Sequence, residues 1–87
     1  IMGGIDSCIY LIESYIKDGW EIFYELKPKY NDDGVQRGFW YDLYIYKPNT
    51  ETPWINDFHE TLTDALYSAK FWLLEYMWNG DKHDEEH

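Results

Sequence analysis

The chain has 87 residues, which is enough for one small domain, and 21% of them are Phe, Trp or Tyr. Its 17 Asp and Glu residues against 7 Lys and Arg residues give a formal net charge of −10. Because such a charge repels nucleic acid and anionic membrane surfaces, we expect neither as a direct partner.

No run of the sequence reaches the roughly 18 consecutive apolar residues that a membrane span requires. The first residues lack the basic and then apolar pattern of a signal peptide, and the lone cysteine, Cys8, forms no internal disulfide. We therefore expect a cytoplasmic protein. No linker divides the chain, so we expect a single α+β domain over residues 2–80 and a flexible acidic tail over residues 81–87.

Residues 5–18 are predicted to form a helix, because their apolar residues recur at helical spacing. Gly19 directly follows this stretch and suits the left-handed position at which glycine most easily ends a helix. The face expected to pack on the core consists of Ile5, Cys8, Ile9, Ile12, Tyr15 and Ile16.

Residues 20–27 and 38–47 change to the two-residue alternation that is typical of strands. Pro28 is expected to end the first strand, and Asp33-Gly34 marks a tight turn, so we expect a hairpin. Residues 54–58 are compatible with a short third strand. The side chains expected to face the helices are Trp20, Ile22, Tyr24 and Leu26 on the first strand, and Phe39, Tyr41, Leu43 and Ile45 on the second.

Residues 62–78 are predicted to form a second helix, with Thr61 as its N-cap and its end before Gly80. The resulting order is helix, strand, strand, a third strand if residues 54–58 form one, and helix. We expect an α+β fold with two helices packed on a small antiparallel sheet. The expected core face of the second helix is Leu62, Ala65, Leu66, Ala69, Trp72, Leu73, Tyr76 and Met77.

A second apolar stripe, hereafter the outer stripe, lies nearly opposite the core face of this second helix. One interpretation is that the helix is largely surrounded, between the sheet and the loop over residues 47–59. The other is that the stripe contacts a partner or a second copy, because large exposed apolar patches commonly mark such contacts. The predicted self-association residues are Tyr67, Phe71, Leu74 and Trp78.

The outer face of the predicted hairpin mixes aromatic rings with carboxylates. One interpretation, the favoured one, is that the rings are cross-strand pairs that only stabilise the hairpin. Alternatively, they offer rigid contact area and receive the Arg or Lys side chains of a basic partner. The predicted partner-binding residues, on this face, at the hairpin loop and at the start of the second helix, are Glu21, Phe23, Glu25, Asp32, Asp33, Trp40, Asp42, Tyr44, Tyr46, Asp57, Glu60 and Asp64.

No arrangement of residues in the sequence supports catalysis. His59-Glu60 begins like a zinc-protease motif, but Thr63 stands where the second histidine is required. Cys8 lies on an apolar helix face, where a packed and inert thiol is expected. We therefore expect a protein that is not an enzyme, with no catalytic residues, no cofactor and no metal site.

In size, acidity and element order the chain resembles, at the level of a class, the small counter-defence proteins of phages and mobile elements, such as anti-CRISPR or anti-restriction proteins. That resemblance implies a binding inhibitor that mimics nucleic acid. Carboxylates of this kind can occupy a basic groove that normally holds phosphates. We expect the partner to be a basic protein, such as a nucleic-acid-binding enzyme. The alternative is a non-enzymatic adaptor or structural module that forms a homodimer through the outer stripe.

Overall fold

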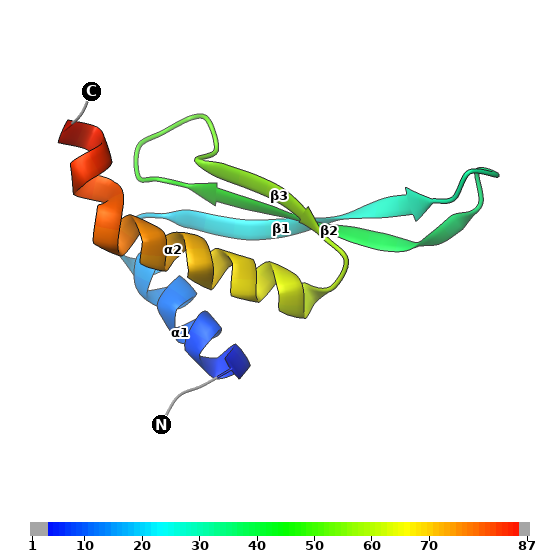
Figure 1. Ribbon diagram of the computed structural model, residues 1–87, viewed down its shortest axis with the longest axis horizontal. Helices are drawn as coiled ribbons and strands as arrows, with labels where there is room; N and C mark the ends of the chain where they lie inside the picture. Colours follow the sequence, from blue (N-terminus) through cyan, green and yellow to red (C-terminus); the bar gives the residue numbers. More distant parts are fainter. Residues whose placement is uncertain (1–3, 86–87) are drawn as a thin grey trace.

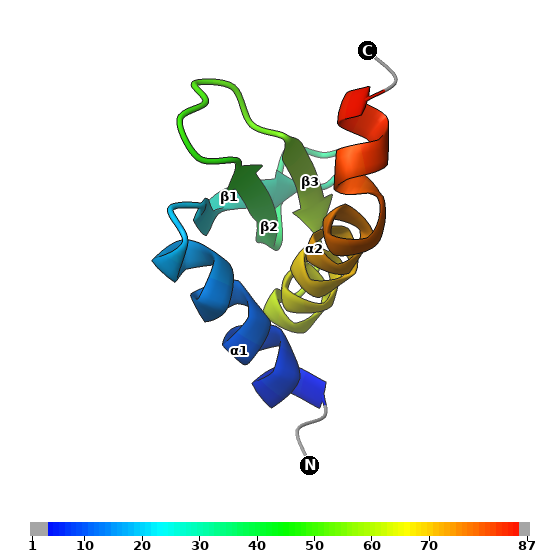
Figure 2. The ribbon, with the colours of Figure 1, turned by 90° about the vertical axis from the view of Figure 1, so that its left-hand side faces the viewer.

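Two helices cover one face of a three-stranded antiparallel sheet, as expected (Figures 1 and 2). The computed structural model describes residues 4–85. Strand β2 lies in the middle of the sheet, between β1 and β3. The third strand, which the sequence left open over residues 54–58, is present at residues 55–59. The elements in chain order are α1 (Gly4–Lys17), β1 (Glu21–Tyr30), β2 (Gln36–Tyr46), β3 (Ile55–His59) and α2 (Leu62–Glu85).

The end of α1 follows from Gly19, whose φ of 101° is in the left-handed region. The amide of Gly19 donates to the carbonyl of Ile16 at 3.0 Å, and the amide of Trp20 donates to that of Tyr15 at 3.1 Å. These two bonds form a Schellman motif, which satisfies carbonyls at the helix end. The motif turns the chain directly into β1, so the prediction of a stop at Gly19 is confirmed.

The predicted end of the first strand at Pro28 is wrong, because β1 continues to Tyr30. Pro28 pairs with Phe39, and the register shifts between Pro28 and Tyr30. Strand β1 lies at the edge of the sheet, where a missing amide is tolerated. The longer strands carry the hairpin well past the helices (Figure 1).

The core lies where α2 crosses β2, and its centre is Trp20. The Trp20 ring makes edge-on contacts with Tyr15 at 5.0 Å, Tyr76 at 4.8 Å and Trp54 at 5.9 Å between centroids. Such edge-to-face pairs add to the stabilisation that burial alone gives. The buried residues of this cluster are Trp20, Leu43, Ile45, Ala69 and Leu73.

The hydroxyl of Thr61 accepts a 3.0 Å hydrogen bond from the amide of Asp64, which confirms the predicted cap of α2. The predicted end before Gly80 is wrong, since the helix runs on to Glu85. A glycine inside a helix costs about 1 kcal/mol relative to alanine but does not stop it. Of the expected tail, residues 81–85 belong to α2, and residues 86–87 lie outside the described residues. Within residues 4–85, no helix has the length and apolar character to cross a membrane.

Several apolar side chains expected in the core are exposed. Ile9 and Ile16 are exposed on α1, where Leu11 packs against the core instead. Met77 is also exposed, because the buried face of α2, centred on Ala65, Ala69 and Leu73, is narrower than predicted. On the sheet, Tyr24, Leu26 and Phe39 are exposed, since the helices leave the far half of the hairpin uncovered (Figure 1).

Candidate protein-binding surfaces

Three aromatic rings stack on one another on the outer face of the sheet. The antiparallel register places Phe23 opposite Tyr44 and Glu21 opposite Tyr46. The Phe23 ring stacks on Tyr44 at 5.1 Å and on Tyr46 at 6.0 Å, with interplanar angles of 20° and 10°. We call these three rings the aromatic platform. Two exposed carboxylates, Glu21 and Glu25, lie on the same face of the same strand.

Asp42 lies on this face but is only 1% exposed, so it is not free to contact a partner. Its carboxylate pairs with the Lys27 ammonium at 2.8 Å and accepts hydrogen bonds from the Tyr44 hydroxyl and the Asn56 amide. Burial alone would raise the pKa of Asp42, but these bonds and the Lys27 charge outweigh it and lower the pKa. In return, the hydrogen bond with Asp42 is the main cause that raises the pKa of Tyr44 and of Lys27. Asp42 therefore holds the hairpin together from within.

Two rings at the far end of this face, Trp40 and Phe58, and the Tyr44 ring of the platform already lie near lysines of the same chain. The Lys29 ammonium lies 4.3 Å from the centroid of Trp40 and pairs with Glu60 at 3.4 Å. The Lys27 ammonium lies 5.8 Å from the centroids of Tyr44 and Phe58. Trp40 and Glu60, both predicted to meet a partner, thus have internal partners.

The remaining predicted acids do not join the platform. Asp32 and Asp33 are exposed in the hairpin loop, which Asn31 orders by accepting hydrogen bonds from two backbone amides. Asp57 faces the helices, and its carboxylate accepts a 3.2 Å bond from the indole of Trp72. Asp64 is exposed in the first turn of α2. The single surface expected from the sequence is therefore divided, and its compact part is Glu21, Phe23, Glu25, Tyr44 and Tyr46.

The outer stripe of α2 is exposed in the described structure. Trp78 is 72% exposed and Phe71 is 54% exposed, while Tyr67 is also exposed and Leu74 is partly buried. The interpretation in which α2 is surrounded does not apply to this face. The loop between β2 and β3 contacts α2 on its core side instead, where Trp54 packs edge-on against Trp72 and Tyr76.

Sequence reasoning missed the lysines that cover the rings, although the signal was present. Lys27 and Lys29 continue the odd-numbered positions of β1 and so share a face with Phe23. It also missed the apolar groove beside β1 that is described below. The available signal for that groove was that α1 carries more apolar residues than its contact with the core uses, since Ile9 and Ile16 are exposed.

Two observations concern metal-ligating and thiol side chains among the described residues. Among residues 4–79, whose side chains the structure describes, no three His, Cys, Asp or Glu side chains group closely enough to hold a metal ion. Cys8 is fully buried. Comparison with protein families, with curated proteins and with solved structures finds no match to this chain.

Proposed function

We propose that this chain is a protein-binding inhibitor that occupies the nucleic-acid site of a basic nucleic-acid-binding protein. The observation that carries the proposal is the aromatic platform, in which the partly exposed rings of Tyr44 and Tyr46 on β2 stack on Phe23, with the exposed Glu21 and Glu25 on either side of Phe23 on β1. Carboxylates replace phosphates in such a site, and the rings supply rigid contact area for Arg or Lys side chains.

The acidic excess of the chain supports the proposal, and four of its lysines contact other groups of the same chain. Lys27 and Lys29 are paired with acids of the same chain. Lys47 lies 5.2 Å from the Trp54 ring centroid, and Lys70 donates to the hydroxyl of Ser7 at 2.9 Å. The formal net charge of −10 already counts these lysines, and their contacts leave it unchanged. The field of such a charge speeds encounter with a basic surface.

The projecting hairpin supports the same proposal through its shape. Its loop carries Asp32 and Asp33, both exposed, beyond the part of the sheet that the helices cover (Figure 1). The projection is narrow enough to enter a groove, and its tip presents these two carboxylates beside the exposed Arg37 of β2. The platform and the loop would then contact two parts of one basic partner.

The test begins with capture of proteins from host lysate on the immobilised chain and on a Glu21→Gln/Glu25→Gln control. A captured basic protein is then purified, and its affinity is measured against salt and against duplex DNA. We expect binding to weaken steeply with salt, to be competed by DNA, and to fall about 2–30-fold in the control variant. Binding that is indifferent to both salt and DNA would contradict the proposal.

A second candidate function is self-association through the outer stripe, favoured by the exposure of Trp78 and Phe71. A symmetric pair of α2 helices would bury the stripe of both copies. Light scattering coupled to size exclusion should then report twice the mass of one chain, and Phe71→Asp should return the monomer. A monomer in the unsubstituted chain, unchanged by Phe71→Asp, would exclude this contact.

A further inference from the structure

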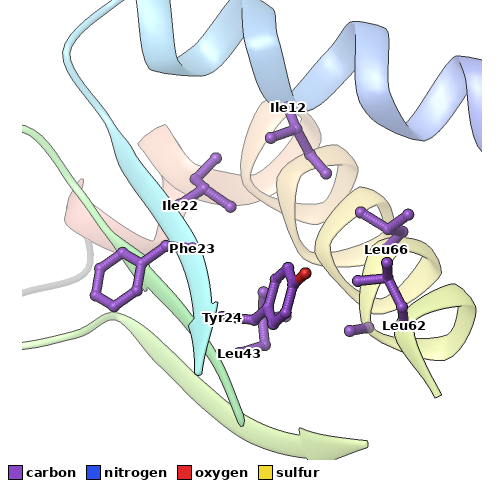
Figure 3. Close-up of a pocket in the computed structure, with 8 residues that line it drawn as sticks. Ile12, Ile22, Phe23, Tyr24, Leu43, Leu62 and Leu66 are labelled. Atoms are coloured by element: carbon purple, nitrogen blue, oxygen red, sulfur yellow. The ribbon is translucent and has the colours of Figure 1, made fainter. Parts of the chain in front are cut away.

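An apolar groove opens between α1 and the sheet, with α2 as its floor (Figure 3). Helix α1 and strand β1 meet at the turn at Gly19 and diverge away from it, while α2 runs along the sheet (Figure 1). The groove lies in the space between them. The volume is about 350 Å³. Its lining includes Ile12 from α1, Ile22 and Tyr24 from β1, Leu43 from β2, and Leu62 and Leu66 from α2.

The edge of strand β1 that borders this groove forms no strand pairing with any described residue. The strand order β1-β2-β3 leaves one side of β1 free over Glu21–Tyr30. Its even-numbered side chains, Ile22 and Tyr24, point toward the groove (Figure 3). Phe23 also borders the groove, but its ring points away from it and stacks on Tyr44. Unpaired amides and carbonyls thus run directly beside an apolar hollow, which is the arrangement that an added strand uses.

Helix α1 extends the apolar wall of the groove. Ile9 and Ile16 lie three and four residues from Ile12 and therefore share its side of the helix. Both are exposed, although the sequence pattern predicts them to be buried. Exposed apolar residues are ordinary when scattered, but a contiguous set beside a hollow marks a binding site.

The charges around the groove select the class of occupant. Glu21 and Glu25 lie on the strand at its border, and Glu13 lies beside Ile9 and Ile16 on α1; Lys17 is the opposing charge at the helix end. A second copy of the chain would bring another net charge of −10 to this border. A small apolar ligand would find few polar groups to orient it, since the lining is aliphatic apart from its aromatic rings.

We propose that an extended segment of a basic partner protein adds to β1 as a further strand, with alternate apolar side chains in the groove. Because side chains of a strand alternate between faces, the intervening positions lie on the outer face. Lysine or arginine there would meet Glu21 and Glu25. This inference depends on the groove and the free edge, so it holds or fails separately from the proposed nucleic-acid mimicry.

The experiment uses a short end-capped peptide that alternates valine and lysine, titrated into the isotope-labelled full chain and followed by NMR. We expect amide shifts and slower hydrogen exchange along residues 22–26 of β1. Two matched peptides are N-methylated on every valine or on every lysine. Since alternate amides of a strand point in opposite directions, one methylated peptide should lose affinity by about tenfold or more while the other still binds.

A groove variant separates the apolar contact from the charge contact. Leu66→Gln should weaken peptide binding by about tenfold, because it places an unpaired amide in the groove. Met77→Gln, an exposed position on the same helix outside the groove, is the control and should bind as the unsubstituted chain does. If Leu66→Gln does not fold by circular dichroism, Ile9→Gln replaces it, since Ile9 is exposed.

Several results would overturn the strand-addition proposal. Shifts confined to the platform residues Phe23, Tyr44 and Tyr46 would place the peptide on the outer face and support only the charge contact. Equal binding of both methylated peptides would exclude backbone pairing. Protection of β1 that grows with protein concentration alone would assign the edge to a second copy. Decanoate that shifts the groove residues, with no response to millimolar peptide, would assign it to a small apolar ligand.

Discussion

Replacing Asp42 with Asn tests whether the buried carboxylate stabilises the hairpin. The substitution keeps the size of the side chain but turns one acceptor oxygen into a donor. That donor would face either the Asn56 amide, at the position of Oδ1, or Lys27 and Tyr44, at the position of Oδ2. A hydrogen bond to a charged group contributes about 1.5–3 kcal/mol, and breaking a buried pair costs about 3–5 kcal/mol. Because Lys27 is partly exposed, we expect a loss of about 3 kcal/mol in the free energy of unfolding.

Urea and thermal unfolding, followed by circular dichroism, measure this loss. For a domain of this size, about 3 kcal/mol lowers Tm by about 12–24 °C. The folded pKa of Asp42 lies below its unfolded value of about 3.9. Its contribution is therefore complete above about pH 4 and is lost as the pH falls through the folded pKa, so the two stability curves should converge in acid.

The control is Glu21→Gln, which removes an exposed carboxylate from the same face and should change stability by less than about 0.5 kcal/mol. The reasoning fails if Asp42→Asn unfolds at the same urea concentration as this control. It also fails if the difference between Asp42→Asn and the unsubstituted chain is as large at pH 2 as at pH 7.

Three further substitutions test the fold by urea unfolding. Leu73→Ala removes a fully buried side chain and should cost about 2–5 kcal/mol; a loss below 1 kcal/mol would place Leu73 outside the core. Thr61→Ala should cost about 1 kcal/mol through the lost cap, whereas Thr63→Ala should change little, and equal effects would contradict the cap. Gly19→Ala should cost about 1–2 kcal/mol from its φ of 101° alone, because the added methyl would meet Pro48 only at an ordinary 3.7 Å; unchanged stability would refute the left-handed turn.

Much of the fold follows from local patterns in the sequence. The alternation in residues 38–47 predicted which side of β2 packs on the helices, and Leu43 and Ile45 are buried there. Gly19 predicted the end of α1 because few other residues adopt its backbone conformation at low cost. Thr61 predicted the start of α2 through a hydrogen bond that spans only three residues. Each of these features depends on neighbours in the chain.

The features that the sequence did not predict depend on distant residues. Asp42 has the pattern of an exposed acid, and its burial requires Lys27 and Asn56 from the two neighbouring strands. Pro28 would end a strand only where its missing amide is needed for a hydrogen bond to a neighbouring strand. Whether it is needed depends on the strand order, which places β1 at the edge of the sheet. The exposure of Ile9 follows from the angle at which α1 leaves the sheet, which no local pattern contains.

The direct contact between the first and last helices has a consequence for how fast the chain folds. The hydroxyl of Tyr15 donates to the carbonyl of Leu73 at 3.4 Å across 58 positions, and Lys70 reaches Ser7 across 63. Folding slows as contacting residues lie further apart in the chain, because the intervening loop must close first. The hairpin depends only on nearby residues and can form early. The core around Trp20 includes Ala69 and Leu73 of α2, so it closes only after α2 has left the ribosome.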